Sequence, residues 1–189
     1  VSEKDIAEIA FTSGTSGNAK GVMLSHRNIC HNLVAAPDIY VSTPEHVWLS
    51  FLPMAHTYEL SLSVLYPFEC GSRVYYLKKA PTPSALMDAF DKVHPNLMCS
   101  VPLIIEKIYR RSVLPTIRHN KVLSWLHERF PSLVYRIVGL KLKKTFGGRL
   151  QAFAIGGAKL DEEVEKVRRE HMNPLWRKMG EIARANGGH

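Results

Sequence analysis

One segment, residues 11–22 (FTSGTSGNAKGV), constrains this chain more than any other. Its residues 12–16 include four hydroxyl side chains, and its glycines leave backbone N–H groups open to close approach by a ligand. Lys20 adds a cation near the far end. Hydroxyls, bare amides and one ammonium group suit a polyphosphate, which has many acceptor oxygens and negative charge. The same composition also fits an ordinary surface loop, because Ser, Thr and Gly are common in turns.

The segment is not a Walker loop. That pattern needs Gly-Lys followed by Ser or Thr, whereas Lys20 is followed by Gly21 and Val22. It does follow residues 6–12 (IAEIAFT), which predict a short buried strand, and ligands of α/β proteins bind in loops after strands. Seven candidate phosphate-binding residues therefore lie in an expected loop at 13–21 and at the strand end before it: Thr12, Ser13, Gly14, Thr15, Ser16, Gly17 and Lys20.

The rest of the chain alternates between strand and helix patterns. Apolar runs at 47–52, 73–77, 97–101 and 151–155 predict strands, and helices are expected at 25–36, 58–66, 82–93, 103–144 and after Asp161. The long helical region is expected to break near Pro115 and Pro131, and Pro37 is expected to end the first helix. This order predicts an α/β fold with a largely parallel sheet covered by flanking helices.

Helix starts are marked by polar residues. Ser25 and Asp161 are suitable N-caps, and Thr82-Pro83 is a typical cap followed by a first-turn proline. Ligands of parallel sheets bind beyond the carboxyl ends of the strands. The loops at Ser13, Pro53 and Gly156 are therefore the candidate binding sites.

Two of these loops carry further candidate residues. His56 follows Pro53 and can donate a hydrogen bond to a carboxylate or phosphate, or simply cap its own loop. Glu59 is expected to orient His56 or to cap the helix that it begins. Gly156, Gly157 and Ala158 turn the chain after a strand, and such a turn leaves room for a flat base or serves only as a connection.

The order of these motifs resembles the adenylate-forming superfamily of acyl-CoA synthetases, luciferases and peptide-synthetase adenylation domains. Residues 11–22 and the continuation MLSHRN resemble its signature loop, with Ser16 where the family usually has Thr and Ala19 where it usually has Pro. FLPMAHTYE (51–59) resembles the second motif, and AIGGAKL (154–160) the turn beside adenine. VPLIIEKIY (101–109) and FGGR (146–149) are most similar to bacterial long-chain fatty acyl-CoA synthetases.

The resemblance implies a ligase that converts a fatty acid, ATP and CoA to acyl-CoA, AMP and pyrophosphate through an acyl-adenylate. It implies that residues 12–17 and Lys20 bind the phosphates, that Lys20 and His56 act in catalysis, and that residues 156–158 lie beside adenine. Thr15 is a candidate ligand of Mg²⁺. Two alternatives stay open: a ligase for another carboxylic acid, and a truncated nucleotide-binding module without catalysis.

The likeness covers residues 5–165. Residues 1–166 are therefore interpreted as part of an AMP-binding domain, and residues 167–189 as an unassigned tail. The family's magnesium-binding Glu, ribose-binding Asp and C-terminal catalytic Lys are not found in the sequence. We therefore expect the isolated chain to have little or no ligase activity.

The formal net charge of +8 suggests a polyanionic partner. Nucleic-acid binding is not expected, because the cations, among them Arg110 and Arg111, are scattered without the interleaved aromatics of a stacking platform. Solvated helix faces and peripheral contact with an anionic membrane remain as interpretations. Three scattered cysteines and the absence of a long apolar run predict a cytoplasmic protein, with the inner membrane face as the place of any such contact.

The apolar stripe Ile104, Ile105 and Ile108 is expected to pack in the core, with the wall of an acyl tunnel as the alternative.

Overall fold

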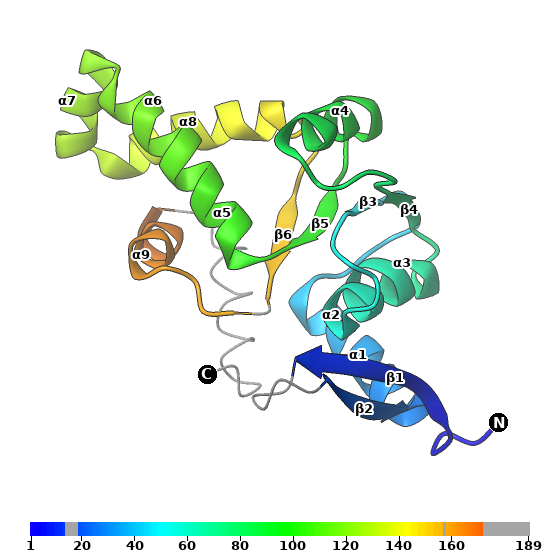
Figure 1. Ribbon diagram of the computed structural model, residues 1–189. Coiled ribbons are helices and arrows are strands. Elements are labelled where there is room, and N and C mark those ends of the chain that lie inside the picture. Colours follow the sequence, from blue (N-terminus) through cyan, green and yellow to red (C-terminus); the bar gives the residue numbers. More distant parts are fainter. Residues whose placement is uncertain (14–18, 157, 172–189) are drawn as a thin grey trace.

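A four-stranded parallel sheet forms the centre of the protein in the computed structural model, which describes residues 1–13, 19–156 and 158–171 (Figure 1). The strands are β3 (Val47–Ser50), β4 (Arg73–Tyr76), β5 (Leu97–Ser100) and β6 (Ala152–Ile155). Their order is β4-β3-β5-β6, and each neighbouring pair is parallel. The predicted α/β class with a largely parallel sheet and flanking helices is therefore confirmed.

Helices cover the two faces of this sheet because its side chains alternate between them. Trp48, Leu97 and Cys99 face a cluster with α1 (His26–Ile39) and with a continuous helical segment. That segment consists of α2 (Thr57–Glu59), the π-helix η1 (Leu60–Leu65) and α3 (Tyr66–Glu69). Leu49 and Met98 face the other way, toward α4 (Pro83–Val93).

A helical arm follows β5. It contains α5 (Pro102–Ile108), the π-helix η2 (Tyr109–Val113), α6 (Leu114–Arg118), α7 (Lys121–Arg129) and α8 (Pro131–Thr145). Together with α9 (Glu162–His171) it has its own core around Tyr109, Val134 and Val164. The three isoleucines of the predicted stripe pack against this core or the second face of the sheet, which supports the core interpretation.

The N-terminal strand differs from the prediction. β1 (Ile6–Ser13) pairs with β2 (Ala19–Ser25) in an antiparallel hairpin that is separate from the parallel sheet. Its apolar residues are exposed, Ile9 to 52% and Phe11 to 75%, so the expectation of a buried strand was wrong. The expected loop at 13–21 is also shorter, because Ala19 and Lys20 already belong to β2. The polar and Gly-rich composition of this stretch concealed the second strand.

Two other boundaries were wrong. Pro37 lies inside α1, which continues to Ile39, and the helix ends with Tyr40 N–H donating to the carbonyl of Ala36. Pro115 lies in the first turn of α6 instead of breaking the arm. The helix expected at 58–66 is present within the helical segment 57–69, whose middle part is a π-helix.

The predicted helix starts were correct. Ser25 forms a reciprocal capping box with Asn28, and Thr82 accepts a hydrogen bond from the N–H of Ala85. The boundary expected near Pro131 is also confirmed, because α8 begins there.

Candidate functional site

The predicted phosphate loop is the connection of the β1–β2 hairpin. Thr12 lies opposite Lys20 and Ser13 opposite Ala19 in the strand register, and the Thr12 hydroxyl lies 3.5 Å from the carbonyl oxygen of Lys20, to which it donates. Thr12 and Lys20 are exposed. Gly14, Thr15, Ser16 and Gly17 lie outside the described residues. The hairpin therefore places three of the predicted ligands at the two ends of the loop.

His56 begins α2 as its N-cap. Its ring Nδ1 accepts a hydrogen bond from the N–H of Tyr58 at 3.3 Å, and its own N–H donates to the carbonyl of Pro53 at 3.0 Å. The capping interpretation is therefore confirmed. Because Nδ1 accepts, the proton of a neutral ring lies on Nε2, and this exposed side chain can offer one donor to a ligand.

Glu59 lies deep beneath this loop and does not act as expected. Its carboxylate accepts hydrogen bonds from the hydroxyls of Ser50 (2.7 Å) and Ser63 (2.9 Å) and from the N–H of Leu52 (3.3 Å). It is 1% exposed, and burial raises the pKa of the carboxyl above its ordinary value. Glu59 therefore joins the end of β3, the start of the His56 loop and η1.

Sequence reasoning missed this function of Glu59. The only signal was the presence of serines four positions after it and at the end of the preceding strand.

Gly156 follows β6 and contacts the His56 loop through Tyr58. The N–H of Gly156 donates to the carbonyl of Ser100 at 3.2 Å. A Cβ at this position would lie only 2.6 Å from Cε2 of the Tyr58 ring, which is closer than carbon atoms can pack. Burial raises the pKa of the Tyr58 hydroxyl. Glycine is required here by the protein's own packing, and this contact brings two of the three predicted motifs together.

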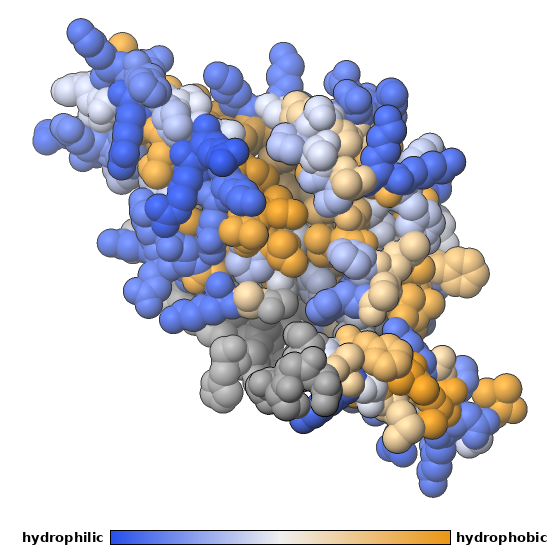
Figure 2. Space-filling model, in the orientation of Figure 1, coloured by the Kyte–Doolittle hydropathy of each residue, from blue (hydrophilic) through white to orange (hydrophobic). Residues whose placement is uncertain are grey.

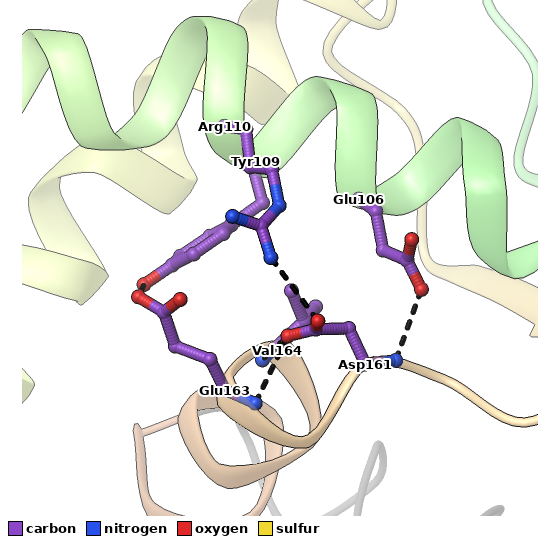
Figure 3. Close-up of polar contacts among 6 residues, drawn as sticks. All are labelled: Glu106, Tyr109, Arg110, Asp161, Glu163 and Val164. Atoms are coloured by element: carbon purple, nitrogen blue, oxygen red, sulfur yellow. Dashed lines mark hydrogen bonds and ion pairs between the residues drawn. The ribbon is translucent and has the colours of Figure 1, made fainter.

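The chain after this turn is attached to α5 and to the π-helix η2 that continues it, as Figure 3 shows. The N–H of Asp161 donates to the Glu106 carboxylate at 2.9 Å, and Arg110 forms an ion pair with Asp161 at 3.1 Å. The hydroxyl of Tyr109 donates to Glu163 at 3.3 Å. Asp161 also accepts from the N–H of Glu163, so its predicted role as N-cap is confirmed.

These contacts hold both ends of the turn that contains the predicted adenine-binding residues. Gly156 is held by Ser100 and Tyr58, and Asp161 by Glu106. Ala158 between them is exposed, and Gly157 lies outside the described residues. The β1–β2 hairpin lies on the same side of the molecule as the carboxyl ends of β5 and β6 in Figure 1. The loop at Ser13 nevertheless belongs to an antiparallel hairpin and not to the edge of the parallel sheet, which corrects the expected arrangement.

A magnesium site is not formed by the part of the chain that the structure describes. No group of three or more His, Cys, Asp or Glu side chains within it could hold a metal ion. Thr15, the predicted ligand, lies outside that part. No chemical step is assigned to a metal here.

The family model described as "AMP-binding enzyme" matches residues 1–180 of the sequence. The chain belongs to the AMP-binding enzyme family. The expected resemblance to adenylate-forming enzymes is thereby confirmed. The match continues past Lys166, and the predicted division into a domain ending at 166 and an unassigned tail stays a prediction.

Several curated relatives are named as long-chain acyl-CoA synthetases or long-chain-fatty-acid–CoA ligases. The chain is 29% identical over 175 residues to long chain acyl-CoA synthetase 7, peroxisomal, of Arabidopsis thaliana, covering 85% of this chain and 25% of that protein. It is 28% identical to long-chain-fatty-acid–CoA ligase 5 of Rattus norvegicus, and the match covers 85% of this chain and 26% of that protein. The chain thus spans about a quarter of the length of these relatives.

Solved structures share the fold. ATP-bound MatB from Rhodopseudomonas palustris superposes with a TM-score of 0.64 at 21% identity, covering 91% of this chain and 28% of that one. The inhibitor-bound N-terminal domain of FACL13 from Mycobacterium tuberculosis superposes with a TM-score of 0.60 at 19% identity. This match covers 87% of this chain and 34% of that domain. The architecture of this chain is therefore that of part of the N-terminal domain of adenylate-forming enzymes.

Proposed function

We propose that this chain is the nucleotide-binding part of a ligase that activates a long-chain fatty acid with ATP and transfers the acyl group to CoA. The observation that carries the proposal is that relatives named as long-chain acyl-CoA synthetases match 85% of the chain. The motifs at residues 12–20, His56 and 156–158 lie within the region assigned to the family.

In this proposal the hairpin binds the triphosphate. Thr12, Ser13 and Lys20 and the loop between them offer hydroxyl, amide and ammonium donors to the β- and γ-phosphates. The exposure of Thr12 and Lys20 leaves these two side chains free to reach a ligand, and Lys20 would stabilise the charge of the departing pyrophosphate. Thr15 is proposed as a ligand of Mg²⁺, which supplies charge stabilisation when bound.

The other two motifs position the adenine and the acid. The backbone of 156–158 would lie along the base, and the contact between Tyr58 and Gly156 fixes the distance from this turn to the His56 loop. His56 would donate from Nε2 to the acyl carboxylate and orient its attack on the α-phosphate. The catalytic contribution of these residues is positioning, so none of them needs to become a nucleophile.

The test is a substrate panel on the product of the whole gene that encodes this chain. We expect pyrophosphate exchange into ATP that depends on acids of about 12 to 18 carbons, because each buried methylene adds about 0.8 kcal/mol of binding energy. CoA should then release AMP and form the acyl thioester. Exchange driven best by a short, dicarboxylic or aromatic acid would replace long-chain specificity with the first alternative.

ATP binding by the gene product with no exchange for any acid would support the second alternative, a nucleotide-binding module. The peripheral contact with an anionic membrane expected from the charge is part of the same proposal.

A further inference from the structure

The positive charge of this protein is concentrated in the helical arm. Residues 102–149 contain eleven Lys or Arg side chains and only two acidic ones, Glu106 and Glu128. The rest of the chain contains fourteen basic and fifteen acidic residues, so it is close to neutral. The arm therefore accounts for the whole net charge of +8.

Helix α8 presents an apolar stripe to the solvent. Leu133, Ile137 and Leu140 are 47%, 42% and 63% exposed, and their spacing of four and three residues places them on one face of the helix. Val134 and Val138, on another face, are buried in the core of the arm. The helix thus needs only one apolar face for folding and carries a second that faces the solvent.

Basic side chains surround this stripe. Lys144 continues it, and Arg136 and Lys141 lie on either side of it at roughly 70° around the helix axis. No acidic residue occurs between Glu128 and Asp161.

Helix α7 repeats the pattern. Val122 and Trp125 are 70% and 65% exposed, and Arg129 shares their face. Phe130, between the two helices, is also exposed. Aromatic and basic residues that are scattered along the sequence are therefore close together on the helix surface. Figure 2 shows the arm at the upper left, with apolar side chains between hydrophilic ones.

We propose that the outer face of α7 and α8 binds the surface of a bilayer that contains anionic lipid. Apolar side chains rimmed by Lys and Arg are the composition of helices that lie in the membrane interface. The aliphatic stripe would enter the acyl boundary, while each nearby cation gains about 1 kcal/mol from the negative surface. None of the helices in the described part of the chain is long and apolar enough to cross a bilayer.

The observations favour a membrane over other anionic partners. A nucleic acid would use the cations but would gain little from leucine and isoleucine side chains. The β1–β2 hairpin also exposes apolar residues, but residues 1–25 contain only two Lys or Arg side chains against three acidic ones. The hairpin therefore lacks the charge that would direct it to an anionic surface.

The inference deepens the membrane contact proposed above and is tested separately from the ligase. The 189-residue chain is floated with vesicles of phosphatidylcholine alone or with 30% phosphatidylserine, without ATP or fatty acid. We expect binding to the anionic vesicles that weakens with salt, and a blue shift of tryptophan fluorescence that is lost in Trp125→Phe. Equal binding to both vesicles, or none, overturns the proposal and leaves nucleotide binding untouched.

Two sets of variants locate the surface. Lys141→Gln with Lys144→Gln should weaken partition roughly 25-fold, about fivefold for each cation, while the control Lys78→Gln with Lys79→Gln, in the exposed segment after β4, should change it less than threefold. Leu133→Gln with Ile137→Gln and Leu140→Gln should abolish the fluorescence shift, whereas Phe68→Ser should not. Phe68 serves as the control because it is an exposed apolar residue in α3, outside the arm.

Equal losses in the control variants would overturn the assignment to α7 and α8. So would binding to duplex DNA that persists when vesicles are not bound, or self-association that the stripe variant removes while vesicle binding is absent. Both lysines are exposed, so their replacement keeps the test valid even if the stripe variant fails to fold.

Discussion

The β1–β2 hairpin and the edge of the parallel sheet both carry motif residues, but they hold them in opposite ways. The hairpin keeps Thr12 and Lys20 exposed on a two-stranded sheet whose apolar side chains are also exposed. At the carboxyl ends of the parallel strands, the His56 loop and Gly156 are supported by the buried Glu59 and the half-buried Tyr58, which contact several elements.

The two regions therefore differ in whether the residues proposed to contact the ligand also support the fold. A group that binds phosphate can be replaced on the hairpin with little effect on folding, because few buried contacts depend on it. At the sheet edge the residues beside the site also fill the core, so binding and stability change together. The comparison can be tested by variants that should affect one property without the other.

Glu59→Ala should have the largest effect. It removes the acceptor for two buried hydroxyls and one N–H and leaves a cavity, so the free energy of unfolding should fall by about 2–4 kcal/mol. Denaturant unfolding of the chain measures this. A change within 0.5 kcal/mol would show that the carboxylate does not support the sheet edge.

The pH dependence of Glu59→Gln sharpens the same point. Because burial raises the folded-state pKa of Glu59 above 4.5, its contribution to stability is complete below that value and is lost as the pH rises through the folded pKa. The free energy of unfolding of the wild type should therefore fall relative to that of Glu59→Gln as the pH rises over this window. A difference that stays constant would contradict the raised pKa.

Gly156→Ala should have the next largest effect. Its new Cβ would overlap the Tyr58 ring, and the resulting strain should cost about 1–3 kcal/mol of unfolding free energy. The double variant with Tyr58→Ala should lose less than the sum of the two single changes, by about 0.5–3 kcal/mol. Strict additivity would mean that the turn and the His56 loop are not coupled through this contact.

Lys20→Ala should change binding without changing stability. Loss of one exposed cation should weaken ATP binding about five- to tenfold in calorimetric titration, while the unfolding free energy changes by less than about 0.5 kcal/mol. Lys78→Ala, at another exposed lysine, is the matched control and should leave both unchanged. An unchanged affinity for ATP would remove Lys20 from the phosphate site.

Gly139→Ala should have the smallest effect and the opposite sign. A Cβ here meets nothing within 4 Å, and the residue lies within α8. Alanine should therefore stabilise the chain by about 0.5–1 kcal/mol. Destabilisation would show that space around a helical glycine does not predict tolerance in this arm, and would weaken the same argument at Gly156.

The sequence predicted local structure well where a short-range signal determines it. Ser25, Thr82 and Asp161 were correct as helix caps because the capping group lies within three residues of its partner. The strands of the parallel sheet were predicted within two residues because each is a short, largely apolar run. The family, too, followed from ordered motifs.

Tertiary structure decided what depends on contacts between distant residues. Burial of β1 was predicted from its apolar residues, but its pairing with β2 instead of the sheet left them exposed. The contacts that support the site join Glu59 to Ser50 and Tyr58 to Gly156, nine and 98 positions apart, and no local pattern specifies them. The sequence by itself determined which hydroxyl, amide and ammonium donors this segment offers, since that depends on residue types; only the fold decided which groups hold the His56 loop and the Gly156 turn in place.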